Sequence, residues 1–103
     1  MAKTEHTPLR DDALEEMFRA ARAEARMIGA DRARALQAGL DALPERQRMA
    51  VTLRHLEGLT NPEIAQAMEI SVEAVESLTA RGKRALAAAL ADRREELGYG
   101  DDG

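Results

Sequence analysis

The chain has 103 residues, enough for one small domain, and it contains no cysteine. The lack of cysteine excludes disulfide bonds, thiolate metal sites and thiol catalysis. Hydrophobic residues make up 45% of the chain but only 2% of it is aromatic, and alanine and leucine, two strong helix formers, are the main apolar residues. Because few β-branched residues alternate with polar ones, we expect an all-α fold.

The formal net charge of −4 counts against a nucleic-acid partner, but the charges are unevenly distributed. Residues 95–103 carry four acids and no base, whereas residues 44–94 carry eight Lys or Arg against seven Asp or Glu. Any affinity from phosphate contacts should therefore be modest and salt-sensitive. The longest apolar run, Ala85–Ala91, is far too short to cross a bilayer, and residues 1–9 lack an apolar signal core, so we expect a cytoplasmic protein without a membrane partner.

The first 43 residues predict a polar N-terminal segment followed by two helices. Residues 1–8 are polar and are expected to be disordered. Residues 9–28 predict an amphipathic helix that stops at Gly29, with acids near its start and arginines near its end. A second helix is expected to run from Asp31, as N-cap, to about Ala42. The apolar stripes are Leu14, Met17, Phe18, Ala21, Ala25 and Ile28 in the first helix, and Ala33, Leu36, Leu40 and Leu43 in the second.

Pro44 is well placed as the first residue of a third helix, because its fixed φ suits a first turn. This helix is expected to run to about Glu57, with Gly58 as its C-cap. Its inward residues are Ala50, Leu53 and Leu56. His55 is expected to be a surface or half-buried helix residue and not a metal ligand, because no other ligand stands at metal spacing.

A sharp start signal follows, since Thr60 and Glu63 have the spacing of a capping box. The fourth helix is expected to end at Met68 or Glu69, and Ser71 to cap a fifth helix over residues 72–95. We therefore expect a small helical bundle of about five helices. Its expected division is a disordered segment 1–8, an amphipathic helix 9–30, a helix-turn-helix domain 31–95 and an acidic flexible tail 96–103.

The short helix, tight turn and long helix of residues 59–86 predict a helix-turn-helix. Small Ala65 is expected where the two helices cross, with the core beneath closed by Ile64, Met68, Ile70, Val75 and Leu78. The outward side of the long helix carries Glu73, Ser77, Ala80 and Arg84, flanked by Glu76 and Arg81. Small residues and arginines on one exposed side of a helix suit the major groove of DNA.

Three blocks carry a family resemblance: LPERQR at 43–48, LRHLEGLTNPEIAQAM at 53–68 and ISVEAVESLTARGKRAL at 70–86. Their order and spacing, over roughly residues 36–91, resemble region 4 of bacterial sigma factors, most closely the extracytoplasmic-function group. The resemblance implies a helical domain that reads the −35 element of double-stranded promoter DNA. It also implies that another face holds the β flap of the RNA polymerase core, and an anti-sigma factor is a further candidate partner.

Carried over by position, the resemblance implies two sets of contact residues. The DNA-binding set is Thr60, Asn61, Glu76, Ser77, Ala80, Arg81, Lys83 and Arg84. Thr60 and Asn61 would lie near a phosphate, and Lys83 and Arg84 would contact the backbone more than the bases. Arg46 and Arg54, on the helix that begins at Pro44, would be exposed on the polymerase-facing side.

Two departures from the family pattern matter. Glu69 stands in the turn where the family usually has glycine, and the left-handed backbone common there costs a non-glycine residue on the order of 1 kcal/mol. In addition, a complete sigma factor of this group has a region 2, which residues 1–35 are too short to contain and do not resemble. We therefore expect either a fragment or a stand-alone regulator with a sigma-like domain.

Other interpretations stay open. The last helices also resemble the output domain of LuxR-type response regulators, although LPERQR argues against that family. A protein-interaction adaptor, binding an anti-sigma factor or polymerase and no DNA, would account for the weakly basic middle and the acidic tail. The helix over residues 9–28 could pack on its own domain or face a partner. No phosphate loop or catalytic triad pattern appears, and the acidic pairs near residues 11–16 are expected to be exposed, so we expect neither an enzyme nor a cofactor.

Overall fold

The computed structural model describes residues 9–23 and 29–92, and within these ranges every regular element is helical. The elements are α1 (Asp11–Ala23), α3 (Ala30–Asp41), α4 (Glu45–Val51), the π-helical turn η1 (Thr52–Leu56), α5 (Asn61–Met68) and α6 (Val72–Ala91). The turn η1 directly prolongs α4. The expected all-α fold with about five helices is confirmed.

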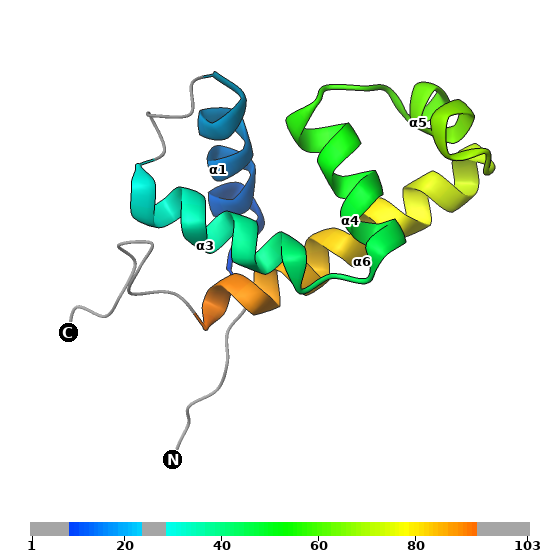
Figure 1. Ribbon diagram of the computed structural model, residues 1–103. Coiled ribbons are helices and arrows are strands. Elements are labelled where there is room, and N and C mark those ends of the chain that lie inside the picture. Colours follow the sequence, from blue (N-terminus) through cyan, green and yellow to red (C-terminus); the bar gives the residue numbers. More distant parts are fainter. Residues whose placement is uncertain (1–8, 24–28, 93–103) are drawn as a thin grey trace, which may run out of the picture.

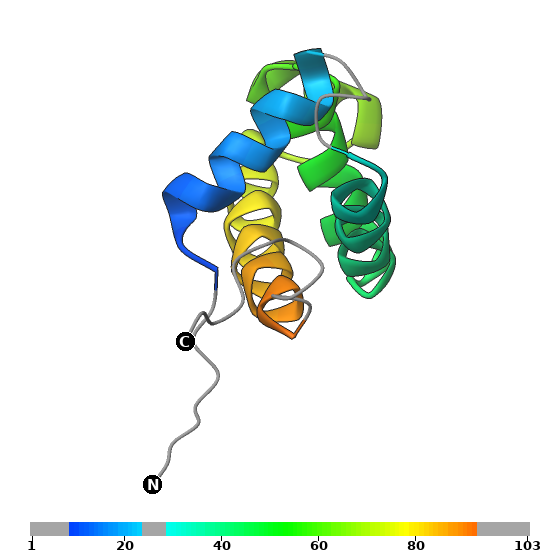
Figure 2. The ribbon, with the colours of Figure 1, turned by 90° about the vertical axis from the view of Figure 1, so that its left-hand side faces the viewer.

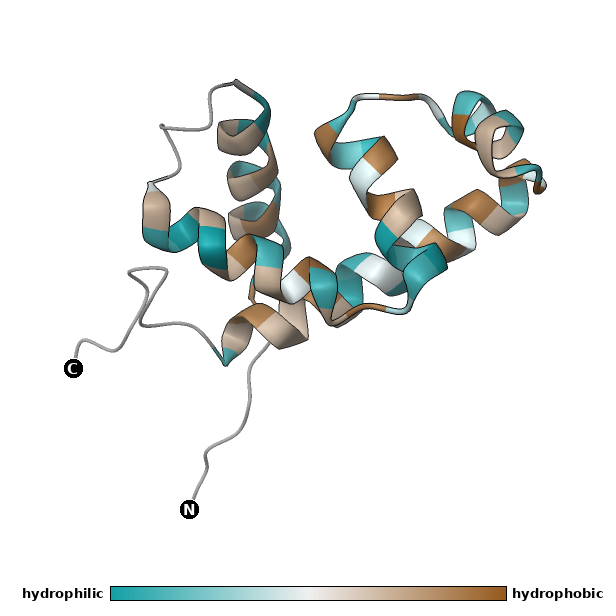
Figure 3. Cartoon of the chain, in the orientation of Figure 1, coloured by the Kyte–Doolittle hydropathy of each residue, from teal (hydrophilic) through white to brown (hydrophobic). Residues whose placement is uncertain are grey.

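The longest helix, α6, is the base on which the other helices pack (Figure 1). Helix α5 lies beside its N-terminal end, α4 packs along it, and α1 and α3 lie over its C-terminal half. Figure 2 shows α1 and α3 on opposite sides of α6. Apolar and polar bands alternate along the helices (Figure 3), as is typical of helices that bury one side.

Two apolar clusters hold the helices together. The larger cluster joins α1, α3, α4 and α6 through the buried residues Leu9, Leu14, Met17, Phe18, Ala35, Leu36, Leu40, Leu43, Val51, Leu86, Ala87 and Leu90. The smaller cluster joins α5 to the start of α6 through Ile64, Ala65 and Val75. Because Leu14, Met17 and Phe18 of α1 are at most 2% exposed, α1 is part of the core of its own domain.

Helices α1 and α3 begin at other residues than those expected. Leu9 precedes α1, and its backbone N–H donates to the carbonyl oxygen of Ala87 in α6 (3.0 Å) while its side chain is buried. Helix α3 begins at Ala30 with Gly29 as N-cap, so the expectation that Asp31 is the N-cap is wrong. Gly29 has φ 85°, which glycine adopts readily, and Asp31 lies in the first turn, paired with Arg34. Ala33, expected to face inward, is exposed.

Helix α4 begins at Glu45 with Pro44 as its N-cap, one residue later than the expected start at Pro44, and it continues into η1. There the N–H of Glu57 donates to the carbonyl oxygen of Thr52, five residues earlier (2.9 Å). This π-helical ending was not expected from the sequence. The C-cap is Glu57, and Gly58, which was expected as the C-cap, is the next residue, with φ 81°.

Some expectations fall outside the described residues. They concern the disordered segment 1–8, Ala25 and Ile28 of the first stripe, the end of the last helix beyond residue 92, and the tail 96–103. The division between residues 30 and 31 stays a prediction, although α1 shares the larger core cluster with α3 and α6.

Candidate nucleic-acid interface

The entry into α5 is set by the capping box that the sequence predicted. The N–H of Glu63 donates to the Thr60 hydroxyl (3.3 Å), and the N–H of Thr60 donates to the Glu63 carboxylate (2.8 Å). Ser71 caps α6 in the expected way, since its hydroxyl accepts from the N–H of Ala74 (3.0 Å). Both helices of the candidate interface therefore begin at residues fixed by local hydrogen bonds.

The turn between α5 and α6 passes through a left-handed residue. Glu69 has φ 59° and ψ 48°, as the family comparison of the turn predicted, and it is the only non-glycine residue with positive φ among those described. The next N–H, that of Ile70, donates to the carbonyl oxygen of Ala65 (3.0 Å) and so closes the end of α5. The tight turn is thus formed at the cost of a strained backbone at Glu69.

Small residues let the helices of this unit approach each other. Ala65, expected at the crossing point, is buried together with Ile64 and Val75. Gly82 is buried against α4, and a Cβ atom built there would lie 2.5 Å from Cγ2 of Val51. These contacts fix which side of α6 faces inward.

On the opposite side of α6, every residue that the sequence predicted to face outward is exposed. The exposed residues are Glu73, Glu76, Ser77, Ala80, Arg81 and Arg84, which we call the reading stripe. It carries two arginines and two glutamates, so its formal charge is zero. Arg81 and Arg84 are exposed, and neither forms an ion pair with another of the described residues.

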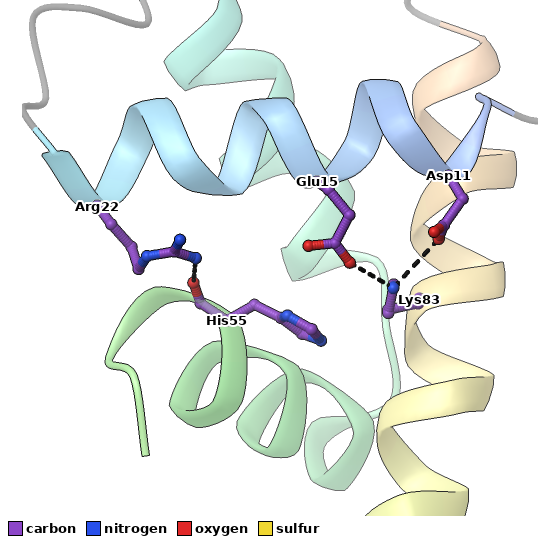
Figure 4. A network of polar contacts seen from close by, with 5 residues as sticks. All are labelled: Asp11, Glu15, Arg22, His55 and Lys83. Atoms are coloured by element: carbon purple, nitrogen blue, oxygen red, sulfur yellow. Dashed lines mark hydrogen bonds and ion pairs between the residues drawn. The ribbon is translucent and has the colours of Figure 1, made fainter. Parts of the chain in front are cut away.

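Lys83 does not share the exposure of its neighbours on α6. Its side chain is only 23% exposed and lies against α1, with Nζ 3.1 Å from a carboxylate oxygen of Asp11 and 2.5 Å from one of Glu15 (Figure 4). Burial acts to lower the pKa of Lys83, but the hydrogen bonds to Glu15 and Asp11 outweigh it and raise the pKa above its ordinary value. Asp11 is exposed, as expected, whereas Glu15 is half-buried, and the sequence did not predict that both acids pair with Lys83.

The other candidate residues lie on separate elements. Thr60 is exposed and Asn61 is half-buried at the start of α5, with the Asn61 carboxamide oxygen buried and without a hydrogen-bond partner among the described residues. Arg46 on α4 and Arg54 on η1 are both exposed, as expected for residues that contact a partner. Contact with DNA or polymerase stays a prediction for all of them.

The structure adds a groove that sequence reasoning did not single out. It lies between α3 and the α4–η1 helix and has a volume of about 340 Å³. Its lining residues are Gln37, Leu40, Asp41, Arg48, Met49, Thr52, Leu53 and Leu56. Met49, at 45% exposure, is the one large apolar residue in the described ranges that is exposed. The spacing of Met49, Leu53 and Leu56 was a usable signal, because three- and four-residue steps place them on one side of a helix.

Two other kinds of site find no support in the described ranges. These residues contain no group of three or more His, Cys, Asp or Glu side chains able to hold a metal ion. Within the same part of the chain, none of the helices combines the length and the apolar character needed to cross a bilayer.

The capped α5, the tight turn and the exposed side of α6 define a helix-turn-helix domain. Residues 33–86 match the family model described as Sigma-70, region 4. The match spans just over half of the chain, and the chain belongs to this family, whose members are transcription domains of sigma factors. No solved structure matches the chain.

Proposed function

We propose that this chain binds the −35 element of promoter DNA through the reading stripe of α6. The observation that carries the proposal is the exposure of this stripe in a chain of the Sigma-70, region 4 family. Ser77 and Ala80 are small enough to let the helix enter the major groove, and Arg81 and Arg84 can donate to guanine or to phosphate. The function is recruitment and positioning in the cytoplasm, without chemistry.

The same domain would contact RNA polymerase on its α4 side. Arg46 and Arg54 are exposed on the α4–η1 helix, and the groove between this helix and α3 presents Met49 and Leu53. An apolar groove with exposed arginines suits a partner segment that combines apolar and acidic side chains. We assign this groove to the polymerase β flap, and the extracytoplasmic-function type remains part of the proposal.

The test is selection of DNA from a pool of duplexes with a randomised window, followed by anisotropy measurements on the enriched duplex and a scrambled one. The wild-type chain should enrich a short motif and bind it more tightly than the scrambled sequence. Arg81→Ala/Arg84→Ala should lose this preference, and each lost base contact should cost about 1–3 kcal/mol. Absence of any enriched motif would count against the proposal.

A matched control is Arg46→Ala/Arg54→Ala, which removes the same charge from the opposite side of the domain. This variant should keep the enriched motif and the affinity for it. Its binding to RNA polymerase core should fall, as should that of Met49→Ser, whereas Arg81→Ala/Arg84→Ala should bind polymerase normally. Loss of DNA binding in the control would show that net charge, and not the reading stripe, determines affinity.

One observation favours a second function, that of an adaptor for polymerase or an anti-sigma factor. The reading stripe has no net charge, because Glu73 and Glu76 offset its two arginines. An adaptor would fail to bind either duplex at low salt and would still bind polymerase. The paired measurements above therefore separate the two functions.

A further inference from the structure

Helix α1 lies outside the family match of residues 33–86, yet it contacts the helix that carries the reading stripe. Three apolar residues of α1 anchor it in the larger core cluster, and its polar edge reaches α6. Figure 4 shows Asp11 and Glu15 pointing from α1 toward Lys83 on α6. This contact between distant parts of the chain has no role in the proposed reading of DNA.

We propose that Asp11 and Glu15 withhold Lys83 from DNA, so that α1 lowers the affinity of the reading stripe. This inference rests on the proposed DNA binding and deepens it. Both acids are within 3.1 Å of Nζ, and Lys83 directly precedes Arg84 of the stripe. The two carboxylates occupy the positions on the ammonium group that phosphate oxygens would otherwise take.

The ion pairs of Lys83 with Asp11 and Glu15 lie at the edge of the candidate interface. Asp11 is 76% exposed, so its charge reaches solvent beside α6. An open hollow of about 410 Å³ adjoins the pair and is lined by Leu9, Asp11, Leu14, Ala80, Lys83, Arg84 and Ala87. Because Ala80 and Arg84 belong to the reading stripe, DNA on that stripe would pass close to Asp11 and Lys83.

The pairing of Lys83 should affect DNA affinity because the reading stripe has few cations. Arg81 and Arg84 are offset by two glutamates, and Lys83 is the only other cation on α6. Each added phosphate contact steepens the plot of log affinity against log salt by about 0.9. Releasing one lysine should therefore change both the affinity and its salt dependence to a measurable extent.

The experiment measures binding of a short duplex of random sequence by the full chain, over about 50 to 200 mM salt. Asp11→Asn/Glu15→Gln should bind more tightly than wild type, with a salt slope steeper by about 0.9. Its advantage over wild type should be about 3.5-fold larger at the low-salt end than at the high-salt end. Adding Lys83→Gln to this variant should return the slope to the wild-type value.

The matched control is Asp12→Asn/Glu16→Gln, which makes the same change in charge on the same helix. These two acids pair with Arg10 and Arg19 and not with Lys83. The control should leave the salt slope unchanged. An equal gain in the control, or a gain that survives Lys83→Gln, would overturn the inference, because either result would reflect general repulsion by α1.

A second measurement needs no substitution and so does not depend on the folding of a variant. The chain has two lysines, Lys3 and Lys83, so isotopically labelled methyl groups added to the amines give few and separable NMR signals. The Lys83 signal of the wild-type chain should stay in place when the duplex is added. A large shift on adding DNA would show that the lysine already contacts phosphate, which overturns the inference.

The outcomes also separate this inference from the proposed function. Binding by the wild type with no change in Asp11→Asn/Glu15→Gln would overturn only the withholding of Lys83. Absence of binding by every variant, even at the lowest salt, would overturn both.

Discussion

Gly82 of α6 and Val51 of α4 are in such close contact that a Cβ atom at Gly82 would lie 2.5 Å from Cγ2 of Val51. The same atom would lie 3.3 Å from the backbone oxygen of Gln47. A valine side chain has little rotamer freedom in a helix and cannot swing away cheaply. Glycine inside α6 is therefore required by packing, although it is a poor helix former.

We expect Gly82→Ala to lower the free energy of unfolding by about 1–3 kcal/mol, because overpacking outweighs the gain in helix propensity. Urea denaturation followed by circular dichroism measures this. Gly39→Ala is the control, since its Cβ would most closely meet terminal methyl groups of Leu86 (2.7 Å) and Leu90 (3.3 Å), which can move. A smaller loss is expected there. Stabilisation by Gly82→Ala would show that α4 and α6 are less closely packed than described.

A substitution at the left-handed turn residue Glu69 should raise the stability of the domain. Glu69→Gly should relieve a cost of about 1 kcal/mol and raise the thermal midpoint by about 4–8 °C. Gln66→Gly, at an exposed position inside α5, should instead destabilise by about 1 kcal/mol. Differential scanning calorimetry compares the three proteins. If both glycines destabilise equally, the backbone at residue 69 is not strained.

The sequence predicted those parts of the site that depend on neighbouring residues. The capping box of Thr60 and Glu63 and the Ser71 cap each involve residues within three positions of one another. The left-handed backbone at Glu69 was expected only from the family resemblance. The exposed stripe of α6 followed from helical periodicity alone. Contacts with DNA and polymerase followed only from the family resemblance and remain proposals.

Sequence reasoning could not predict contacts between distant parts of the chain. Lys83 has the same helical setting as Arg84, and only the position of α1 explains why it is paired with Asp11 and Glu15. The π-helical turn η1 was missed for a similar reason. Helix α1 contacts η1 there, because the Arg22 side chain donates to the carbonyl oxygen of His55 (2.8 Å). Local sequence patterns do not reveal such a contact.

The burial of Phe18 predicts that α1 is needed for stability. Its side chain is fully buried, so Phe18→Ala should cost about 3–5 kcal/mol, a large part of the stability of a small domain. Arg19→Ala, on the exposed side of the same helix, should change stability by no more than about 1 kcal/mol. Urea denaturation distinguishes the two. Equal effects would mean that α1 does not pack into the core.

The half-buried His55 predicts a loss of stability on mild acidification. Its ring stacks on Phe18, with centroids 4.7 Å apart and planes 9° from parallel. Burial lowers the pKa of His55 below its ordinary value of 6.5, and Lys83, Arg54 and Arg22 lower it further, although Glu15 acts to raise it. The unfolded chain therefore takes up the proton first as the pH falls.

Stability contributed by neutral His55 should thus be fully present well above pH 6.5 and be lost as the pH falls through 6.5 toward the lower pKa of the folded state. One proton limits the slope to about 1.4 kcal/mol per pH unit. His55→Phe keeps a ring against Phe18 but cannot titrate, so its free energy of unfolding should depend less on pH. Urea denaturation of both proteins between about pH 7.5 and 5 isolates this difference, because the remaining titrating groups are shared. Identical pH dependence in the two proteins would mean that His55 titrates alike in the folded and unfolded chains, and that its burial against α1 does not oppose protonation.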